Sequence, residues 1–223
     1  MIQAIVFDMD GVLVDSTPSH ARAFAEVLEK IGVTDFDYSL YAGERTPDVF
    51  RRIAAERGLE LAPERIEEMS RVKSARAQNL MAENDCFMPE YKLVLETLSA
   101  RYPLALASSA SSTSVEAFLE RGGVRALFGS VLSGDDVERA KPDPEIYARS
   151  FAQLKAPPER CAVVEDARSG IVAGRLAGAG MLIGFERRPE ERHKLTEAGA
   201  GPVIGALRDL LALFAAPAEG VKA

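Results

Sequence analysis

The first fifteen residues constrain the fold more than any other stretch. Residues 5–7 form a short apolar run, a pattern typical of a strand buried on both faces of a sheet. Two carboxylates, Asp8 and Asp10, follow this run, and Gly11 then allows the chain to turn. Acids at the end of a buried strand lose hydration and repel each other, so their burial is costly without a compensating partner. Hard oxygen ligands suit Mg²⁺. Taken alone, the segment indicates either a metal site or a strand that ends at an acidic turn.

The next part of the chain has helical patterns only. Helices are expected over about 16–32, 46–58 and 63–80, because apolar residues recur there at helical spacing and Gly or Pro marks their ends. No convincing strand lies in this region. From Pro89 onward, helical segments alternate with short apolar runs at 104–107, 131–132, 162–164, 181–183 and 202–204.

Such alternation predicts a parallel sheet with helices on both faces. We therefore expect an α/β fold: a doubly wound parallel-sheet core, Rossmann-like, with an inserted α-helical cap. The predicted core comprises residues 1–15 and 88–223, and the predicted cap comprises residues 16–87.

Charge and composition exclude several classes of partner. The 223 residues carry a formal net charge of −7 at pH 7, whereas non-specific nucleic-acid binding needs a basic face. No apolar run is long enough to cross a bilayer, and the N-terminus has the pattern of a strand rather than of a secretory leader. We expect a cytoplasmic protein with no nucleic-acid or membrane partner. No long apolar stripe requires a second copy, so we expect a monomer.

Polar residues gather at one predicted edge of the sheet. Ligands of doubly wound sheets bind at the carboxyl ends of the strands. The residues predicted to lie there, or in the loop between two of the strands, are Asp8, Asp10, Ser108, Ser109, Lys141, Glu165 and Asp166. Acids, hydroxyls and a lysine in one place indicate phosphoryl transfer.

Each group has a role in that chemistry. Asp8 can attack phosphorus and form an aspartyl-phosphate, and Asp10 can protonate the leaving oxygen and later accept a proton from water. Ser108 can donate to a phosphoryl oxygen, and Lys141 can stabilise the charge that spreads over it. Taken singly, Ser108 could instead cap a helix and Lys141 could be a solvated loop cation.

The acids also form the expected metal site. Mg²⁺ would be held by Asp8, the carbonyl of Asp10, Glu165 and Asp166, and would let an anionic nucleophile approach an anionic phosphate. Without the N-terminal pair, Glu165 and Asp166 could be read as a cap for the following helix.

Four segments resemble the motifs of the haloacid dehalogenase superfamily, in order and with similar spacing. They are FDMDGVLVDS at 7–16, ALASS at 105–109, AKPDPEIY at 140–147 and VVEDARSGI at 163–171. The resemblance covers nearly the whole chain and implies a capped phosphatase or phosphomutase whose mobile helical cap closes over the site. Asp10 favours phosphate esters, since the dehalogenases and phosphonate-cleaving members lack an aspartate there. Ala140 and Ser109 replace a common glycine and a common asparagine without removing a catalytic group.

The cap is similar to that of β-phosphoglucomutases, which share a histidine, a cap-loop glycine and a cap lysine, here His20, Gly43 and Lys73. In those enzymes an arginine three places after the glycine grips the second phosphate. That place is Thr46 here, and the arginine stands one earlier, at Arg45. Residues assigned to substrate binding are Gly11, His20, Gly43, Arg45, Lys73 and Ser109. His20 could equally be a hinge hydrogen-bonder, and Arg45 and Lys73 could be solvated charges.

These observations lead to one expected function and two alternatives. A mutase must hold a bisphosphate in two orientations and needs a firm cap-side anion site, so the displaced arginine favours hydrolysis. We expect a Mg²⁺-dependent phosphatase acting on a small phosphorylated substrate, such as a sugar phosphate. One alternative is a sugar phosphomutase using the same nucleophile. The other is a phospho-accepting module without turnover, although receiver modules are shorter and lack a helical insert.

Overall fold

A computed structural model describes residues 1–41, 44–189 and 191–215. Its strands and longer helices, in chain order, are β1 (Ala4–Phe7), α1 (Thr17–Leu28), α2 (Thr46–Arg57), α3 (Pro63–Ala82), α4 (Tyr91–Ser99), β2 (Leu104–Ala107), α5 (Ser112–Gly122), β3 (Phe128–Leu132), α6 (Glu145–Gln153), β4 (Cys161–Glu165), α7 (Arg168–Leu176), β5 (Met181–Phe185), α8 (Glu191–Ala198), β6 (Val203–Ile204) and α9 (Asp209–Leu213). Within the described ranges, no helix is long and apolar enough to span a bilayer.

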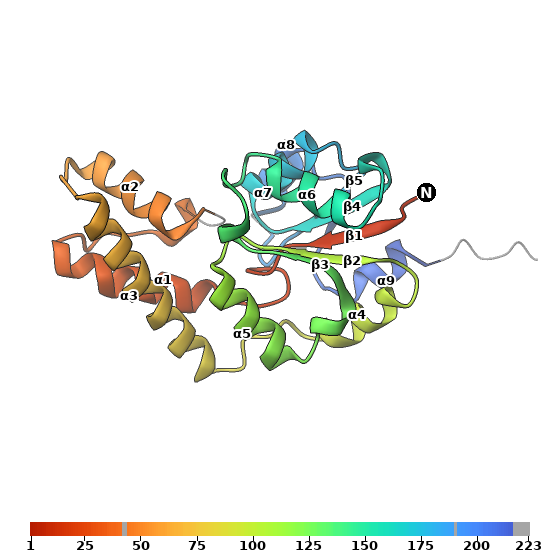
Figure 1. The fold of residues 1–223 in the computed structure, drawn as a ribbon, viewed down its shortest axis with the longest axis horizontal. Coiled ribbons are helices and arrows are strands. Elements are labelled where there is room, and N and C mark those ends of the chain that lie inside the picture. Colours follow the sequence, from red (N-terminus) through yellow and green to blue (C-terminus); the bar gives the residue numbers. More distant parts are fainter. Residues whose placement is uncertain (42–43, 190, 216–223) are drawn as a thin grey trace, which may run out of the picture.

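The strands of the described residues form one parallel sheet in the order β3-β2-β1-β4-β5-β6 (Figure 1). All four residues of β1 are buried, because β1 lies between β2 and β4 and helices cover both faces. Phe7 is in register with Leu106 of β2 and with Val164 of β4. The residues that follow these three positions therefore meet at one edge. The predicted α/β fold with a doubly wound parallel sheet is confirmed.

Two apolar layers hold the sheet to its helices. Helices α4, α5 and α9 lie on one face, and α6, α7 and α8 lie on the other (Figure 1). On the first face Leu95 and Phe118 pack against Leu106, and on the second Phe151 and Ile171 pack around Val163. Burial of such side chains stabilises a fold by roughly 1.5–3 kcal/mol each, so both faces contribute to fixing the sheet edge.

The helices α1, α2 and α3 form a separate lobe with its own apolar cluster (Figure 1). Phe24 of α1, Phe50 of α2 and Met69 of α3 are buried in that cluster. Two connecting segments, 13–15 and 86–88, join the lobe to the core and run antiparallel side by side. The Asp15 amide donates to the Cys86 carbonyl at 2.7 Å, and the Met88 amide donates to the Leu13 carbonyl at 2.9 Å.

Some element bounds differ from those expected. The strand expected at 131–132 spans Phe128–Leu132. Gly129 and Ser130 interrupt its apolar run, and the register with β2 shifts at Gly129, but Phe128 and Ser130 still pair with β2. Helix α4 begins at Tyr91 rather than at Pro89, since Glu90 has a φ of 62° and cannot belong to the helix.

Candidate active site

The turn after β1 places the first acids at the sheet edge. The Asp8 amide donates to the Val164 carbonyl at 3.0 Å, so Asp8 continues the pairing of β1. Gly11 follows with a φ of 86°, a conformation that glycine adopts without strain. A Cβ at Gly11 would lie 1.8 Å from Oδ2 of Asp166. Glycine is therefore required there both for the turn and for the close approach of Asp166.

Lys141 joins the nucleophile candidate to the acids of β4. Its Nζ donates to Asp8 Oδ1 at 2.6 Å, to Glu165 Oε1 at 2.7 Å and to the Ala107 carbonyl at 3.0 Å. All three charged side chains are buried. Burial alone would lower the pKa of Lys141, but the carboxylates of Asp8 and Glu165 outweigh it and raise that pKa well above its usual value. Lys141 is thus a fixed cation at the site.

Three carboxylates form a group of the size that a metal ion needs. One oxygen each from Asp8, Glu165 and Asp166 lies within 4.8 Å of the other two. Burial, together with neighbouring carboxylates, raises the pKa of Asp8 well above its usual value and that of Asp166 to about 8. Such clustering of acids is unfavourable unless a cation compensates it, and these oxygen donors are those that Mg²⁺ prefers.

The backbone also makes room for this group. A Cβ at Gly170, in the first turn of α7, would lie 1.7 Å from Oε1 of Glu165. The Ala167 amide donates to Oε2 of the same carboxylate at 3.2 Å. The cradle around Glu165 and Asp166 is therefore built from two glycines and fits a divalent cation.

A polar chain from the cap reaches Asp10. His20 Nε2 lies 3.3 Å from Asp10 Oδ1, and Lys73 Nζ lies 2.5 Å from His20 Nδ1. Burial alone would raise the pKa of Asp10. The hydrogen bond and the charge of His20 outweigh this effect and lower the pKa of Asp10 to about 2. Burial lowers the pKa of Lys73 to about 7, with its ammonium 4.2 Å from the Phe24 ring centroid. Asp10 is thus held as a carboxylate by the cap.

The serines after β2 complete the site. Ser108 is fully buried, its hydroxyl lies 3.5 Å from Asp10 Oδ2, and it accepts a hydrogen bond from the Ala110 amide at 3.0 Å. Ser109 lines a cavity of about 50 Å³ that also contacts Asp8, Asp10 and Lys141. This cavity is small, so it holds little more than the reacting group.

Comparison with known proteins fixes the family. A family model described as haloacid dehalogenase-like hydrolase matches residues 2–178. The chain belongs to this family. The predicted superfamily is thereby confirmed, together with the prediction that the chain is an enzyme of it.

Individual haloacid dehalogenase-like relatives extend over nearly the whole chain. A phosphorylated carbohydrates phosphatase of Thermotoga maritima is 33% identical over 211 residues, covering 91% of this chain and 94% of that protein. A CbbY variant from Rhodobacter sphaeroides, solved with xylulose 1,5-bisphosphate, is 30% identical with a TM-score of 0.79, covering 94% of this chain and 96% of that one. A β-phosphoglucomutase from Clostridium difficile is 25% identical with a TM-score of 0.81, covering 94% and 93% of the two chains.

Most of the residues assigned from the family motifs lie together in the structure. Of the assigned residues, those that line the small cavity are Asp8, Asp10, His20, Lys73, Ser109, Lys141, Glu165 and Asp166. Ser108 contacts this set through Asp10, and Gly11 contacts it through Asp166. Gly43 lies outside the described residues.

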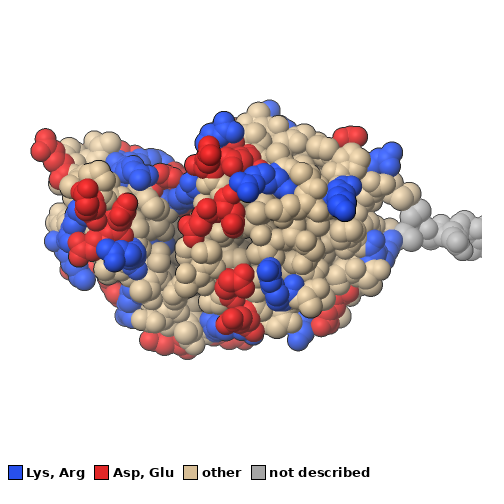
Figure 2. Space-filling view, viewed as in Figure 1, with Lys and Arg blue, Asp and Glu red and all other residues tan. Residues whose placement is uncertain are grey.

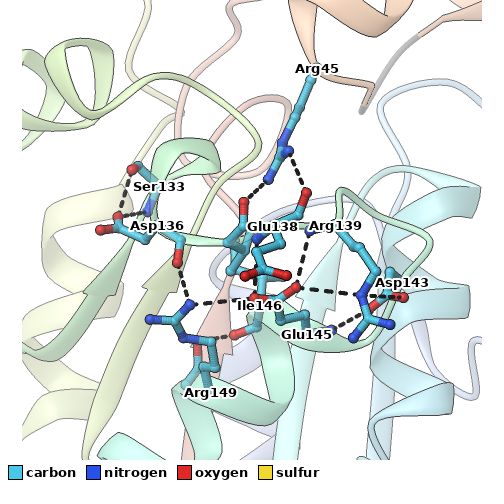
Figure 3. A network of polar contacts seen from close by, with 11 residues as sticks. Arg45, Ser133, Asp136, Glu138, Arg139, Asp143, Glu145, Ile146 and Arg149 are labelled. Atoms are coloured by element: carbon cyan, nitrogen blue, oxygen red, sulfur yellow. Dashed lines mark hydrogen bonds and ion pairs between the residues drawn. The ribbon is translucent and has the colours of Figure 1, made fainter.

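Arg45 makes a different contact from the one that its motif position suggested. It precedes α2, and its guanidinium donates to the carbonyls of Val137 at 2.5 Å and Glu138 at 3.2 Å (Figure 3). Glu145 fixes this core loop by accepting from the amides of Glu138 at 3.1 Å and Arg139 at 3.0 Å. Arg45 therefore ties the cap to the loop that leads to Lys141, and it does not line the small cavity.

Tyr147 is a site residue that the motif analysis did not single out. Its buried hydroxyl donates to Glu165 Oε1 at 2.6 Å, beside the bond from Lys141. The residue lies within AKPDPEIY, and a tyrosine in a helix facing a buried sheet needs a partner for its hydroxyl. The sequence therefore indicated that the Tyr147 hydroxyl has a buried partner, but it did not indicate that the partner is Glu165.

Proposed function

We propose that the chain is a Mg²⁺-dependent phosphatase that hydrolyses a small phosphorylated metabolite, such as a sugar phosphate, through an aspartyl-phosphate. The observation that carries the proposal is Asp8 at the end of β1, bonded to Lys141 and grouped with Glu165 and Asp166. The name of the Thermotoga relative, a phosphatase of phosphorylated carbohydrates, supports the same substrate class.

The attack on phosphorus would begin at Asp8. Its Oδ1 is held by Lys141, so the other oxygen is available to form the bond to phosphorus while the ester oxygen leaves. Lys141 and the Ser108 hydroxyl would stabilise charge on the phosphoryl oxygens. Asp8, Glu165, Asp166 and the Asp10 carbonyl would hold Mg²⁺, which would supply the positive charge that offsets repulsion between nucleophile and phosphate.

Asp10 would handle the proton in both halves of the reaction. With a pKa of about 2 it is ionised in this arrangement, the form that accepts a proton from the water attacking the aspartyl-phosphate. To protonate the leaving oxygen in the first half, Asp10 must lose the contact with His20 that stabilises its carboxylate. We propose that movement of the cap (residues 16–87) against the core (1–15 and 88–223) makes and breaks this contact.

A sugar phosphomutase is the second candidate, and the likeness to a β-phosphoglucomutase favours it. Arg45 distinguishes the two, because its guanidinium is engaged with core carbonyls. A cap-side phosphate site built on Arg45, as the similarity to β-phosphoglucomutases would suggest, would need that guanidinium free. Hydrolysis therefore remains our proposal, while the monomeric state and the cytoplasmic location stay predictions.

The test measures phosphate release in Mg²⁺ over a panel of sugar phosphates and other small phosphate esters. In parallel, β-glucose 1-phosphate with a trace of glucose 1,6-bisphosphate is assayed for glucose 6-phosphate. Phosphate release without isomerisation supports the proposal, and isomerisation with little free phosphate supports the mutase. Asp8→Asn is expected to reduce turnover by roughly three orders of magnitude or more, and full activity in that variant would refute the assignment.

A further inference from the structure

A large cleft opens beside the catalytic cavity. It has a volume of about 750 Å³ and is lined by the segment around η2 (Tyr38–Leu40) and α2 of the cap and by α7 and α8 of the core. Tyr38, Lys141 and Asp166 line both spaces, so the cleft is continuous with the site of reaction. Figure 2 shows the notch between the two lobes with charged side chains gathered around it. Its volume is in the range of small-molecule sites.

The lining of this cleft is basic although the protein is acidic. Its cationic residues are Arg45, Arg52, Lys141, Arg168, Arg175, Arg187, Arg188 and Lys194, and its acidic residues are Glu44, Asp48, Asp166 and Glu191. The cations are thus twice as numerous as the acids, in a chain of net charge −7. Positive charge is therefore concentrated in this cleft although the net charge of the protein is negative, and it attracts anions to the cleft.

Five of these eight cations pair with no carboxylate among the described residues, and one of the five, Arg45, is bonded to backbone carbonyls instead. Arg52 pairs with Glu44, and Arg187 pairs with Asp15. In the part of the chain that the structure describes, no ion pair is made by Arg168, Arg175, Arg188 or Lys194. Unpaired cations are available to a ligand without first breaking an internal contact.

Unused donors continue this lining toward the reacting group. The Ser169 hydroxyl and the Arg187 Nε are buried and have no hydrogen-bond partner among the described residues. Arg187 Nε lies 4.0 Å from Asp166 Oδ2, at the inner end of the cleft. Glu191 accepts from the amides of Arg187 and Arg188, at 3.0 Å and 3.2 Å, and so fixes the turn that carries both arginines. Buried donors without partners are costly, and an anionic ligand would satisfy them.

We propose that this cleft is a second anion site that binds a non-reacting phosphate group of the substrate while the reacting phosphate lies at Asp8. The inference rests on the proposed function and narrows it to substrates with two phosphate groups. A neutral sugar would gain nothing from the unpaired cations, whereas a second phosphate gains charge-assisted hydrogen bonds. The unpaired cations of this site lie on α7, on α8 and in the turn between β5 and α8.

The test compares fructose 1,6-bisphosphate with fructose 1-phosphate in Mg²⁺, using the double variant Arg188→Ala/Lys194→Ala. Both side chains are exposed, so the fold should tolerate their loss. We expect wild-type kcat/KM to be at least about tenfold higher for the bisphosphate, and the double variant to lose most of that preference. Its kcat/KM for the monophosphate should change less than about twofold. Arg125→Ala, an exposed arginine outside the cleft, should match the wild type on both esters.

A binding experiment tests this inference independently of the proposed function. Affinities of the same two esters for Asp8→Asn, with and without the double substitution, are measured by calorimetry in Mg²⁺, and free orthophosphate serves as a third ligand. A preference for the bisphosphate that the double substitution removes supports the second anion site even if the wild type hydrolyses neither ester. Equal affinity for both esters, or an equal loss for both in the double variant, overturns it. Orthophosphate binding that depends on Arg188 and Lys194 without any bisphosphate preference would also overturn it, by indicating an effector site instead.

Discussion

Replacing Lys73 with methionine should change how the stability of the protein depends on pH. Lys73 is 2% exposed, and burial lowers its pKa from 10.5 to about 7. In the unfolded chain the lysine regains its ordinary pKa, so between these two values the unfolded state binds more protons than the folded state. The free energy of unfolding contributed by this group therefore rises with pH across that window. Below about pH 7 the cost of burying the ammonium is complete, and above the unfolded pKa it vanishes.

The size of the effect follows from the shift. The pKa of Lys73 falls from 10.5 to about 7. At about 1.36 kcal/mol for each pKa unit, burial of the ammonium costs roughly 5 kcal/mol as an upper limit. Lys73→Met removes this cost together with the contacts to His20 and Phe24, each worth about 1 kcal/mol. The variant should then be more stable than the wild type by about 1–3 kcal/mol near pH 6, and the advantage should disappear toward pH 10.

Urea unfolding at several pH values measures this difference. The chain has no tryptophan, so far-ultraviolet circular dichroism is the suitable signal. Lys30→Met, at an exposed lysine on the same lobe, is the matched control and should show no such pH dependence. A constant difference between wild type and Lys73→Met from pH 6 to pH 10 would refute the reasoning, because Lys73 would then titrate as it does in the unfolded chain.

Two further predictions concern the metal cradle and the contact between the lobes. Gly11→Ala places a Cβ 1.8 Å from Asp166 Oδ2 and forces a strained φ of 86°, so Mg²⁺ affinity measured by calorimetry should fall at least about tenfold and stability by about 1–3 kcal/mol. An unchanged Mg²⁺ affinity would contradict the cradle. Arg45→Ala removes the hydrogen bonds to Val137 and Glu138, so limited proteolysis around residues 84–88 should accelerate by roughly fivefold, corresponding to about 1 kcal/mol. Arg51→Ala is its control, because the Arg51 side chain bonds to Asp48 of the same helix and to no other described residue. Equal cleavage rates in the two variants would contradict this role for Arg45.

Parts of the site that depend on strand ends were predictable from the sequence. Asp8, Asp10 and Asp166 follow strands whose apolar pattern is plain, and the carboxyl ends of parallel strands must share an edge. Lys141 was placed by its motif, yet its simultaneous bonds to Asp8 and Glu165 depend on how the chain between β3 and α6 folds back.

Contacts between separately patterned elements were not predictable. The bond of Arg45 to Val137 requires the position of the cap relative to the core, and no periodicity in either segment encodes that position. The bond of Tyr147 to Glu165 requires the rotation of α6 about its axis. The lowered pKa of Lys73 follows from its burial against His20 and Phe24 of α1, whereas in sequence it resembles its solvated neighbours on α3. Tertiary packing decides all three.

The two paired segments that connect the lobes, 13–15 and 86–88, have a consequence for the order in which the protein folds. The whole cap separates β1 from its partner β2 along the chain, and closing so long a loop costs entropy and slows formation of the central pair of strands. The cap has an apolar cluster of its own, and the hydrogen bonds of Asp15 to Cys86 and of Met88 to Leu13 hold its two ends together. A cap that folds first would therefore make β1 and α4 neighbours in a much shorter effective loop. The insertion would then speed assembly of the sheet that it interrupts.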